Sequence, residues 1–408
     1  MSDVVFVAPF FLPATLRFIS AVASLDDVRM GLISQDPETK LPAGVRARLA
    51  GHHRVDSALD PSQLVAAVRR FEKHFGAQPA RLIGTLEELQ VPLGVVRDEL
   101  GIAGIGAAAA NNFRDKEQMK RVLAAAGLPC ARHRLIEDAV AATGFAAEVG
   151  FPLVVKPPAG AGARGTYRLD SEGQLAQYLE MIPPSLARPA LFEEFMTGDE
   201  HSFDSVSVDG EIVWSSVNHY YPSPLEVVET PWIQWCVVLP REVDDDRYGA
   251  IRAVAGPALK ALGLDTGLSH MEWFRRPDGG VAISEIGARP PGAQFMTLIS
   301  YAHDVDMYRA WAQLAATGRF EPPERPYAAG AVYLRGQGDG TVQAVHGLAE
   351  AQAELGGLVV EAKLPKLGQS PSGGYEGEGY VILRHPGTAA VERGLAYLLR
   401  TLRVELGP

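Results

Sequence analysis

Lys156 ends an apolar run and precedes a glycine-rich loop, a combination that can bind phosphate. The stretch FPLVVKPPAGAGARGTYRLD (151–170) contains Gly160, Gly162 and Gly165 in a G-x-G-x-x-G spacing. Gly165 leads into a β-like segment, and the lysine precedes all three glycines, so neither a dinucleotide fingerprint nor a P-loop fits. A protein-kinase loop has the reverse order. The remaining alternatives are a phosphate-binding lysine with a glycine hairpin, or a β-turn beside a surface lysine.

An acidic segment, LFEEFMTGDE (191–200), follows this loop. Its backbone at residues 194 and 196 could pair with the edge of an adenine, and Glu200 could accept hydrogen bonds from both ribose hydroxyls. Glutamates beside a strand are usually only solvated, so this segment alone leaves both interpretations open.

Two carboxylates, Glu272 and Glu285, lie on the two arms of a predicted hairpin (270–287) with its turn at 277–280. Their spacing of thirteen positions allows both to face the same side. Converging carboxylates repel each other unless a cation lies between them, and Mg²⁺ prefers one or two carboxylates plus phosphate oxygens. Arg289 follows closely and could meet a transferring phosphoryl group.

His270 lies two positions before Glu272, so both face the same side of a strand. His270 either orients a carboxylate, accepts a proton, or is structural. Six other side chains are candidates for a substrate pocket, with core packing as the alternative for each: Tyr220, Tyr221, Trp232, Trp235, His219 and His303.

The first hundred residues alternate β-branched runs with helical stretches. Strands are predicted at 4–9, 30–34 and 80–86, and helices at 14–25, 62–75 and 91–102. This alternation predicts a parallel sheet that is covered by helices on both faces.

Beyond residue 108 the pattern changes. Asn112 is predicted to cap a helix that ends at Gly127, and a second helix (138–149) lies between two strands. The segment 190–221 reads as a hairpin with its turn at Asp209-Gly210. Further helices are predicted at 246–262 and 305–318, and the tail (327–408) is expected to alternate strands and a helix.

Composition and charge exclude several classes of protein. The 408 residues carry a net charge of −11 and no basic run, which argues against a nucleic-acid partner. No stretch approaches the roughly 20 uncharged apolar residues of a membrane helix. The two cysteines, Cys130 and Cys236, form no C-x-x-C pair, so we expect buried thiols and a cytoplasmic location.

The ordered motifs DKEQM, PLVVKPP, EEFMTGDEHS and ISEIGARPPG resemble those of the ATP-grasp superfamily, which includes biotin carboxylase and D-alanine–D-alanine ligase. The resemblance covers about residues 1–320. The motif SHMEWF and the glycine-rich tail look most like the L-amino-acid ligases and related carboxylate–amine ligases.

This resemblance implies a combined α/β and α+β fold. A Rossmann-like domain (1–108) would precede an ATP-grasp domain (109–324), whose mobile lid subdomain would span about 118–194. A C-terminal α+β subdomain (325–408) would complete the catalytic half.

The resemblance also implies roles for particular residues. Lys116 and Lys156 would hold the phosphates of ATP, and Glu272 and Glu285 would bind Mg²⁺ or Mn²⁺. Arg289 would face the intermediate and act in catalysis with Lys156. His270 is a further catalytic candidate, from its position two residues before Glu272 rather than from the resemblance. The nucleotide would further be contacted by the loop residues Gly160, Gly162, Arg164, Gly165 and Thr166, by Glu193, Glu194, Phe195 and Met196 at the adenine, and by Glu200 at the ribose.

Two positions depart from the superfamily pattern. Gly287 replaces an asparagine that usually adds a metal ligand, which leaves the number of metal ions open. Arg164 replaces a small serine in the loop and either contacts phosphate or is solvated.

The implied activity is ATP-dependent ligation of a small carboxylate, such as an amino acid, to an amine through an acyl-phosphate, with release of ADP. The alternatives are activation of formate or bicarbonate, and nucleotide binding without catalysis. By the same resemblance a homodimer is a further expectation.

Overall fold

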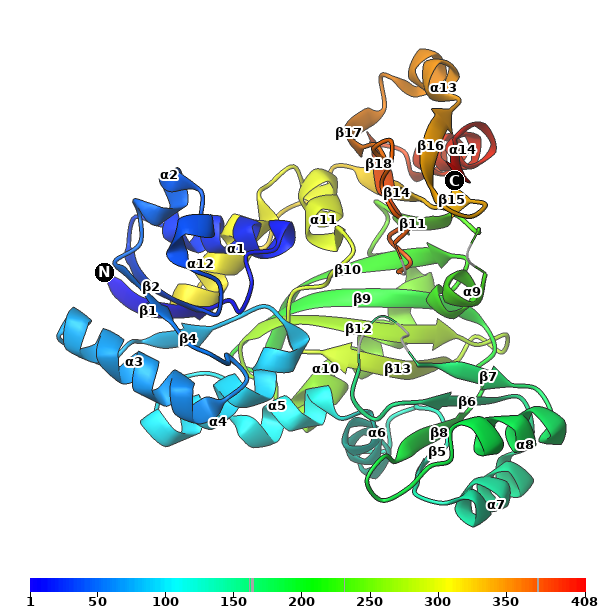
Figure 1. Cartoon of the computed structure of the whole chain (residues 1–408), viewed down its shortest axis with the longest axis horizontal. Coiled ribbons are helices and arrows are strands. Elements are labelled where there is room, and N and C mark those ends of the chain that lie inside the picture. The colour runs from blue at the N-terminus through cyan, green and yellow to red at the C-terminus, as the bar shows by residue number, and fades with distance from the viewer. Residues whose placement is uncertain (161, 163–164, 231, 373) are drawn as a thin grey trace.

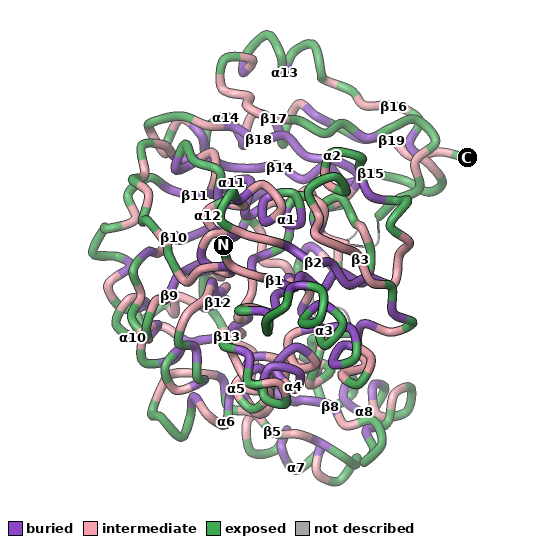
Figure 2. Tube along the Cα trace, turned by 90° about the vertical axis from the view of Figure 1, so that its left-hand side faces the viewer, coloured by how far each residue is buried: buried purple, intermediate pink, exposed green. Residues whose placement is uncertain are grey.

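The computed structural model describes residues 1–160, 162, 165–230, 232–372 and 374–408. Within these residues the strands form four sheets, and Figure 1 shows the longest one at the centre of the molecule. The strands are largely buried, whereas the outer turns of many helices are exposed (Figure 2). The predicted combination of α/β and α+β architecture is confirmed.

The N-terminal sheet is parallel and covered by helices on both faces. Its elements are β1 (Ser2–Val7), α1 (Pro13–Ala23), β2 (Val28–Ser34), η1 (Glu38–Lys40), α2 (Ala43–Arg46), β3 (Gly51–Arg54), α3 (Pro61–Phe75), β4 (Arg81–Ile83), η2 (Glu87–Leu89) and α4 (Gln90–Leu100). The strand order is β3-β2-β1-β4. Alternate residues of β1 point to opposite faces, so Val5 packs with α3 and α4 while Phe6 packs with α1. The sequence did not predict β3, because GHHR carries no apolar alternation.

A small antiparallel sheet with the order β5-β8-β6-β7 carries the lysine strand. Its elements are β5 (His133–Ile136), α7 (Ala139–Val149), β6 (Leu153–Lys156), β7 (Tyr167–Leu169), α8 (Glu172–Met181) and β8 (Ala190–Glu194). Leu153 and Val155 are buried with the helices α7 and α8. Lys156 alternates with these residues and therefore points away from that core.

The large sheet is antiparallel and has the order β13-β12-β9-β10-β11-β14-β18-β17. Its strands are β9 (Asp199–Val208), β10 (Glu211–Tyr221), β11 (Trp235–Leu239), β12 (Gly267–Arg275), β13 (Val281–Gly287), β14 (Ala328–Leu334), β17 (Val359–Lys363) and β18 (Gly379–His385). The β9–β10 hairpin turns at Asp209-Gly210, where both residues have positive φ, as the sequence predicts. The sheet continues past residue 325 without a break.

Helices cover both faces of the large sheet. These are α5 (Ala107–Arg114), α6 (Lys116–Ala125), α9 (Pro224–Glu229), η3 (Asp246–Tyr248), α10 (Gly249–Leu262), α11 (Phe295–His303) and α12 (Met307–Thr317). Met271 and Trp273 of β12 pack with α6 and α10, whereas Tyr220 and Trp235 pack on the side of α11. Helix α12 reaches back to α1 and to the N-terminal sheet, so it ties the two sheets together.

The C-terminal segment adds a short sheet of order β15-β19-β16 and two helices where one was expected. Its remaining elements are β15 (Gly336–Gln337), β16 (Thr341–His346), α13 (Leu348–Leu355), α14 (Thr388–Thr401) and β19 (Arg403–Gly407). Helix α14 packs on β14 and β18 and buries Val391 and Leu395 against them.

The predicted cap at Asn112 is wrong, because two helices meet where one was expected. Asp115 caps α6, since its side-chain oxygen accepts a hydrogen bond of 2.9 Å from the Gln118 amide. Asn112 lies inside α5 and donates to the carbonyl of Leu262 at 3.2 Å. Within the described chain no helix has the length and apolar character needed to cross a bilayer.

Candidate active site

A cleft lies between the small sheet and the large sheet, and most of the predicted site residues line it. The lining includes Lys116, Lys156, Gly160, Gly162, Thr166, Glu193, Glu194, Phe195, Met196, Glu200, His270, Glu272, Glu285 and Arg289. Gly165 is not among the described residues that line the cleft. Arg164 falls outside the described residues, so its prediction stays untested.

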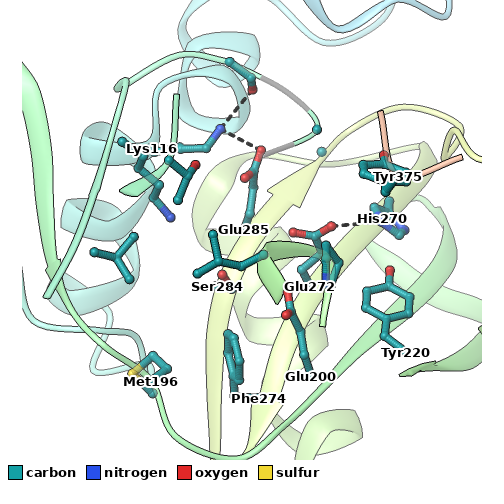
Figure 3. Close-up of a pocket in the computed structure, with 18 of the residues that line it drawn as sticks. Lys116, Met196, Glu200, Tyr220, His270, Glu272, Phe274, Ser284, Glu285 and Tyr375 are labelled. Atoms are coloured by element: carbon teal, nitrogen blue, oxygen red, sulfur yellow. Dashed lines mark hydrogen bonds and ion pairs between the residues drawn. The ribbon is translucent and has the colours of Figure 1, made fainter. Parts of the chain in front are cut away.

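The two hairpin carboxylates face the cleft together. Glu272 and Glu285 are direct cross-strand partners in the β12–β13 ladder, which places both side chains on one face. Figure 3 shows both carboxylates pointing into the pocket. The Lys116 ammonium lies 2.8 Å from Glu285 Oε1 and also donates to the carbonyl of Gly160 at 3.0 Å. Lys116 therefore connects the glycine loop to the carboxylate pair.

The charges around this pair fit a bound cation. Burial and the neighbouring charge of Glu272 raise the pKa of Glu200 to about 8, so Glu200 is a third carboxyl group that senses the charge of the pair. Burial also acts to raise the pKa of Glu285, but Lys116 and Lys156 outweigh it and the net direction is down. Among the described residues no group of three or more His, Cys, Asp or Glu side chains is placed to hold a metal. Two carboxylates completed by phosphate oxygens, the arrangement that Mg²⁺ prefers, remain compatible with this geometry.

Lys120, a buried lysine that the sequence analysis missed, shares the counter-ion Glu193 with Lys156. Glu193 lies between two ammonium groups, with Oε2 3.0 Å from Lys156 Nζ and Oε1 3.4 Å from Lys120 Nζ. Lys120 is fully buried and also donates to the carbonyl of Ser284 at 2.9 Å. Burial lowers the pKa of Lys120. Burial also acts to lower the pKa of Lys156. The charges of Glu193 and Glu285 outweigh burial there, so the pKa of Lys156 is raised. Lys120 follows Lys116 by four positions on one helix, and this spacing could have predicted that both lysines lie on the same face.

The segment proposed for adenine binding, residues 193–196, makes hydrogen bonds and ring contacts with other parts of the protein. The Glu194 carboxylate accepts hydrogen bonds from the Arg132 amide at 2.9 Å and from Arg132 Nε at 2.7 Å. The Glu194 amide donates to the Arg132 carbonyl at 3.0 Å, so this N–H is already used. The guanidinium of Arg168 lies 4.3 Å from the ring centroid of Phe195. Met196 lies at the lower edge of the cleft in Figure 3.

Arg289 is held by a residue from the N-terminal half of the chain. Its guanidinium pairs with the carboxylate of Glu87 in η2 and donates to the carbonyl of Pro290 at 2.9 Å. Burial acts to lower the pKa of Arg289, but Glu87 reverses this and raises it. A Cβ atom at Gly287 would lie 3.5 Å from Glu87 Oε2, so this carboxylate lies close to the position of the usual asparagine. Glu87 and Arg289 are 202 positions apart, so no local sequence pattern could have predicted that they pair.

His270 is oriented by a buried acid that was also missed. Its Nδ1 atom lies 2.6 Å from Asp204 Oδ1, and its Nε2 atom lies 3.7 Å from Glu272 Oε1. The other oxygen of Asp204 accepts from Asn218 Nδ2 at 2.5 Å. Burial acts to lower the pKa of His270, but Asp204 and Glu272 raise it to about 9. β9 and β12 are neighbours in the sheet, and His270 is directly opposite Asp204. A prediction that these two strands pair would have placed both side chains on one face.

The remaining candidates divide clearly. Tyr220 and Trp235 line the cleft, whereas Tyr221 and Trp232 are largely exposed and do not. His219 bonds to the Tyr248 hydroxyl at 2.7 Å on the opposite face of the large sheet. His303 contacts the Glu324 carbonyl at 2.7 Å, outside the cleft. Cys236 is buried, Cys130 is half-buried, and both are free thiols.

The histidine pair His201 and His219 predicts a loss of stability in acid. Their rings are 4.6 Å apart, and burial lowers their pKa values to about 4 and about 3 from the ordinary 6.5. Below pH 6.5 the unfolded chain therefore binds protons that the folded chain does not, and stability falls as the pH falls toward 4. Each histidine contributes a slope of about 1.4 kcal/mol per pH unit in this window.

His201→Phe tests this prediction, because the imidazole nitrogens of His201 have no hydrogen-bond partner in the described part of the chain. Urea unfolding between pH 4.5 and 7 is expected to give a flatter pH dependence for the variant, with similar stability at pH 7. An unchanged slope would show that His201 is not a source of the acid sensitivity.

Most of the residues that line the cleft lie in a part of the chain that matches a known family. Residues 121–303 match the family model described as the ATP-grasp domain, and the chain contains this domain. Its relatives include L-amino acid ligases. The L-arginine-specific L-amino acid ligase of Bacillus subtilis is 24% identical over 237 residues, which cover 56% of each chain.

Solved structures share the fold along the whole chain. The L-amino acid ligase from Bacillus licheniformis superposes with a TM-score of 0.77 at 18% identity, covering 100% of this chain and 99% of that one. The N5-carboxyaminoimidazole ribonucleotide synthetase from Thermotoga maritima gives a TM-score of 0.71 at 18% identity and covers both chains fully. The matches to the first two curated relatives cover only 63% and 56% of their own length.

Proposed function

We propose that this protein is an ATP-dependent carboxylate–amine ligase that forms an amide bond through an acyl-phosphate. One observation carries the proposal: the paired carboxylates Glu272 and Glu285 face a cleft that also contains Lys116, Lys156 and Arg289. Positive charge along one side of a phosphate path and a carboxylate pair at its end are what phosphoryl transfer requires. The similarity to L-amino acid ligases makes an amino acid the favoured acid substrate.

The nucleotide would lie with its phosphates under the glycine loop. Lys116 and Lys156 would neutralise phosphate oxygens, and loop amides such as those of Gly162 and Thr166 would close over the outer phosphate. The ion pair with Glu193 holds the Lys156 ammonium group in place. The backbone near Met196 would meet the adenine, and Glu200 would accept hydrogen bonds from the ribose.

Glu272 and Glu285 would hold Mg²⁺ or Mn²⁺. When bound, this cation stabilises negative charge that develops on the phosphate oxygens. Arg289 would contact the carboxylate that attacks the outer phosphate, and its pairing with Glu87 fixes the guanidinium before substrate arrives. His270, fixed by Asp204, would orient the second substrate oxygen.

In the proposed reaction a carboxylate oxygen attacks the γ-phosphorus and the bond to the β-phosphate oxygen breaks, which releases ADP. The amine nitrogen then attacks the acyl carbon, the bond to phosphate breaks, and the amine loses a proton. These steps require positioning and charge stabilisation rather than a nucleophilic side chain.

ADP release across a panel of amino acids and amines, with either substrate omitted in turn, tests the proposal. We expect ADP only when an acid, an amine and Mg²⁺ are all present. Release with formate or bicarbonate alone would favour the activation of a small acid. Tight ATP binding without ADP release for any pair would leave a nucleotide-binding protein and refute the ligase.

A further inference from the structure

The cleft has two chemically distinct ends. The charged side chains gather near the glycine loop and the carboxylate pair, whereas the other end carries aromatic rings. Figure 3 shows Lys116 and Glu285 on one side, Tyr220 and Tyr375 on the other, and Glu272 between them. We call the set Tyr220, Trp235, Phe295 and Tyr375 the aromatic end.

The four rings come from separate elements and form one packed cluster. Trp235 of β11 contacts the other three, with ring centroids 5.5 Å from Tyr220, 6.3 Å from Phe295 and 4.7 Å from Tyr375. Tyr333 stacks on Trp235 at 4.9 Å from behind and supports it. The rings are therefore fixed before any ligand arrives.

The lining beside these rings is also uncharged. It consists of Pro224 and Leu225 of α9 and of Gly292 and Ala293 before α11. A charged substrate side chain that packs against this wall, away from His270 and Glu272, would lose its hydration without gaining a partner, which is costly. An apolar or aromatic side chain would instead exchange water for ring contacts.

Tyr375 links this end to the glycine loop. It lies in the segment before β18, and its ring Cε1 is 3.6 Å from the position of a Cβ atom on Gly162. Burial and the charge of Glu272 raise the pKa of the Tyr375 hydroxyl, so it stays neutral. The C-terminal segment thus provides a wall of the cleft and places Tyr375 near Gly162.

We propose that the aromatic end binds a large apolar or aromatic side chain of the acid substrate, with Tyr375 as the residue that determines this specificity. The proposal rests on the ligase function proposed above. The His270 ring lies 5.5 Å from the Phe295 ring, centroid to centroid, so a carboxylate held by His270 would place its substituent beside the rings.

Trapping with hydroxylamine tests the specificity without knowledge of the natural amine, because hydroxylamine converts an acyl-phosphate into a hydroxamate. The donors are glycine, alanine, leucine, phenylalanine, glutamate and lysine. We expect leucine and phenylalanine to give kcat/KM values at least about 10-fold above those of glycine, glutamate and lysine. Higher values for glutamate, lysine or glycine would overturn the proposal.

Two variants separate the ring from its hydroxyl group. Tyr375→Ala is expected to lower kcat/KM for phenylalanine about 10-fold more than for alanine, whereas Tyr375→Phe keeps the wild-type ratio. Tyr221→Ala is the matched control, because Tyr221 neighbours Tyr220 but is exposed outside the cleft. An equal loss for all donors in Tyr375→Ala would indicate a structural role only and would refute the specificity.

A binding measurement distinguishes failure of this inference from failure of the ligase function. If no donor gives hydroxamate, the ligase function fails. Calorimetric titration of 3-phenylpropionate into the full chain then still tests the aromatic end. Binding that weakens about 10-fold in Tyr375→Ala supports the inference, and equal or undetectable binding in both proteins refutes it.

Discussion

Replacing Glu285 with glutamine is expected to lower the rate of ADP formation by about 10²–10³-fold, the loss typical of one preorganised transition-state contact. The change keeps the size of the side chain but removes one charge from the carboxylate pair with Glu272. It also removes the counter-charge of Lys116, 2.8 Å away. Initial rates at increasing Mg²⁺ should show that the variant needs more metal for half-maximal activity.

Glu211→Gln is the matched control for this change, since Glu211 is an exposed carboxylate at the start of β10, in the same sheet but outside the cleft. Its rate and its metal dependence should equal those of the wild type. If Glu285→Gln retained more than about a tenth of the activity, the carboxylate pair would not be the metal site that we propose.

The largest loss of stability is expected for Glu193→Gln. Glu193 is 4% exposed and is the partner of Lys120 and Lys156. Without its charge two buried ammonium groups lose their counter-ion, and breaking a buried pair in this way costs about 3–5 kcal/mol. Urea unfolding at pH 7 measures the free energy of unfolding directly.

Two further variants show whether the charge is responsible. Glu194→Gln alters the adjacent residue, whose carboxylate bonds to the exposed Arg132, and should cost less than about 1 kcal/mol. Adding Lys120→Met to Glu193→Gln removes one unpaired ammonium group and should restore part of the stability. A double variant that is less stable than Glu193→Gln would contradict this explanation.

The carboxylate pair could be predicted because its geometry is local. Glu272 and Glu285 are thirteen positions apart across a Pro-Asp-Gly-Gly turn, and the period of two in a strand places both on one face. Lys156 could be predicted for the same reason, as it alternates with Leu153 and Val155 in a short strand. The helix start at 116 was misplaced, because Asn112 and Asp115 are both good caps.

The partners of these residues could not be predicted in the same way. Glu87 is 202 positions from Arg289, and Asp204 is 66 positions from His270. Tyr375 reaches the cleft from the glycine-rich tail, where no sequence pattern indicates a cleft residue. Each contact depends on how separate elements pack, and a side chain that bonds to a distant partner leaves no periodic signal in the sequence.

By itself the sequence determined the elements and the chemical groups: strands and helices follow from period and caps, and the lysines, glycines and carboxylates follow from motif order. Only the tertiary structure decided which of these groups meet in the cleft and which distant residues hold them there. The physical reason is the range of the interactions. Backbone preferences act over a few residues, whereas burial, ion pairing and ring packing join residues that the chain keeps far apart.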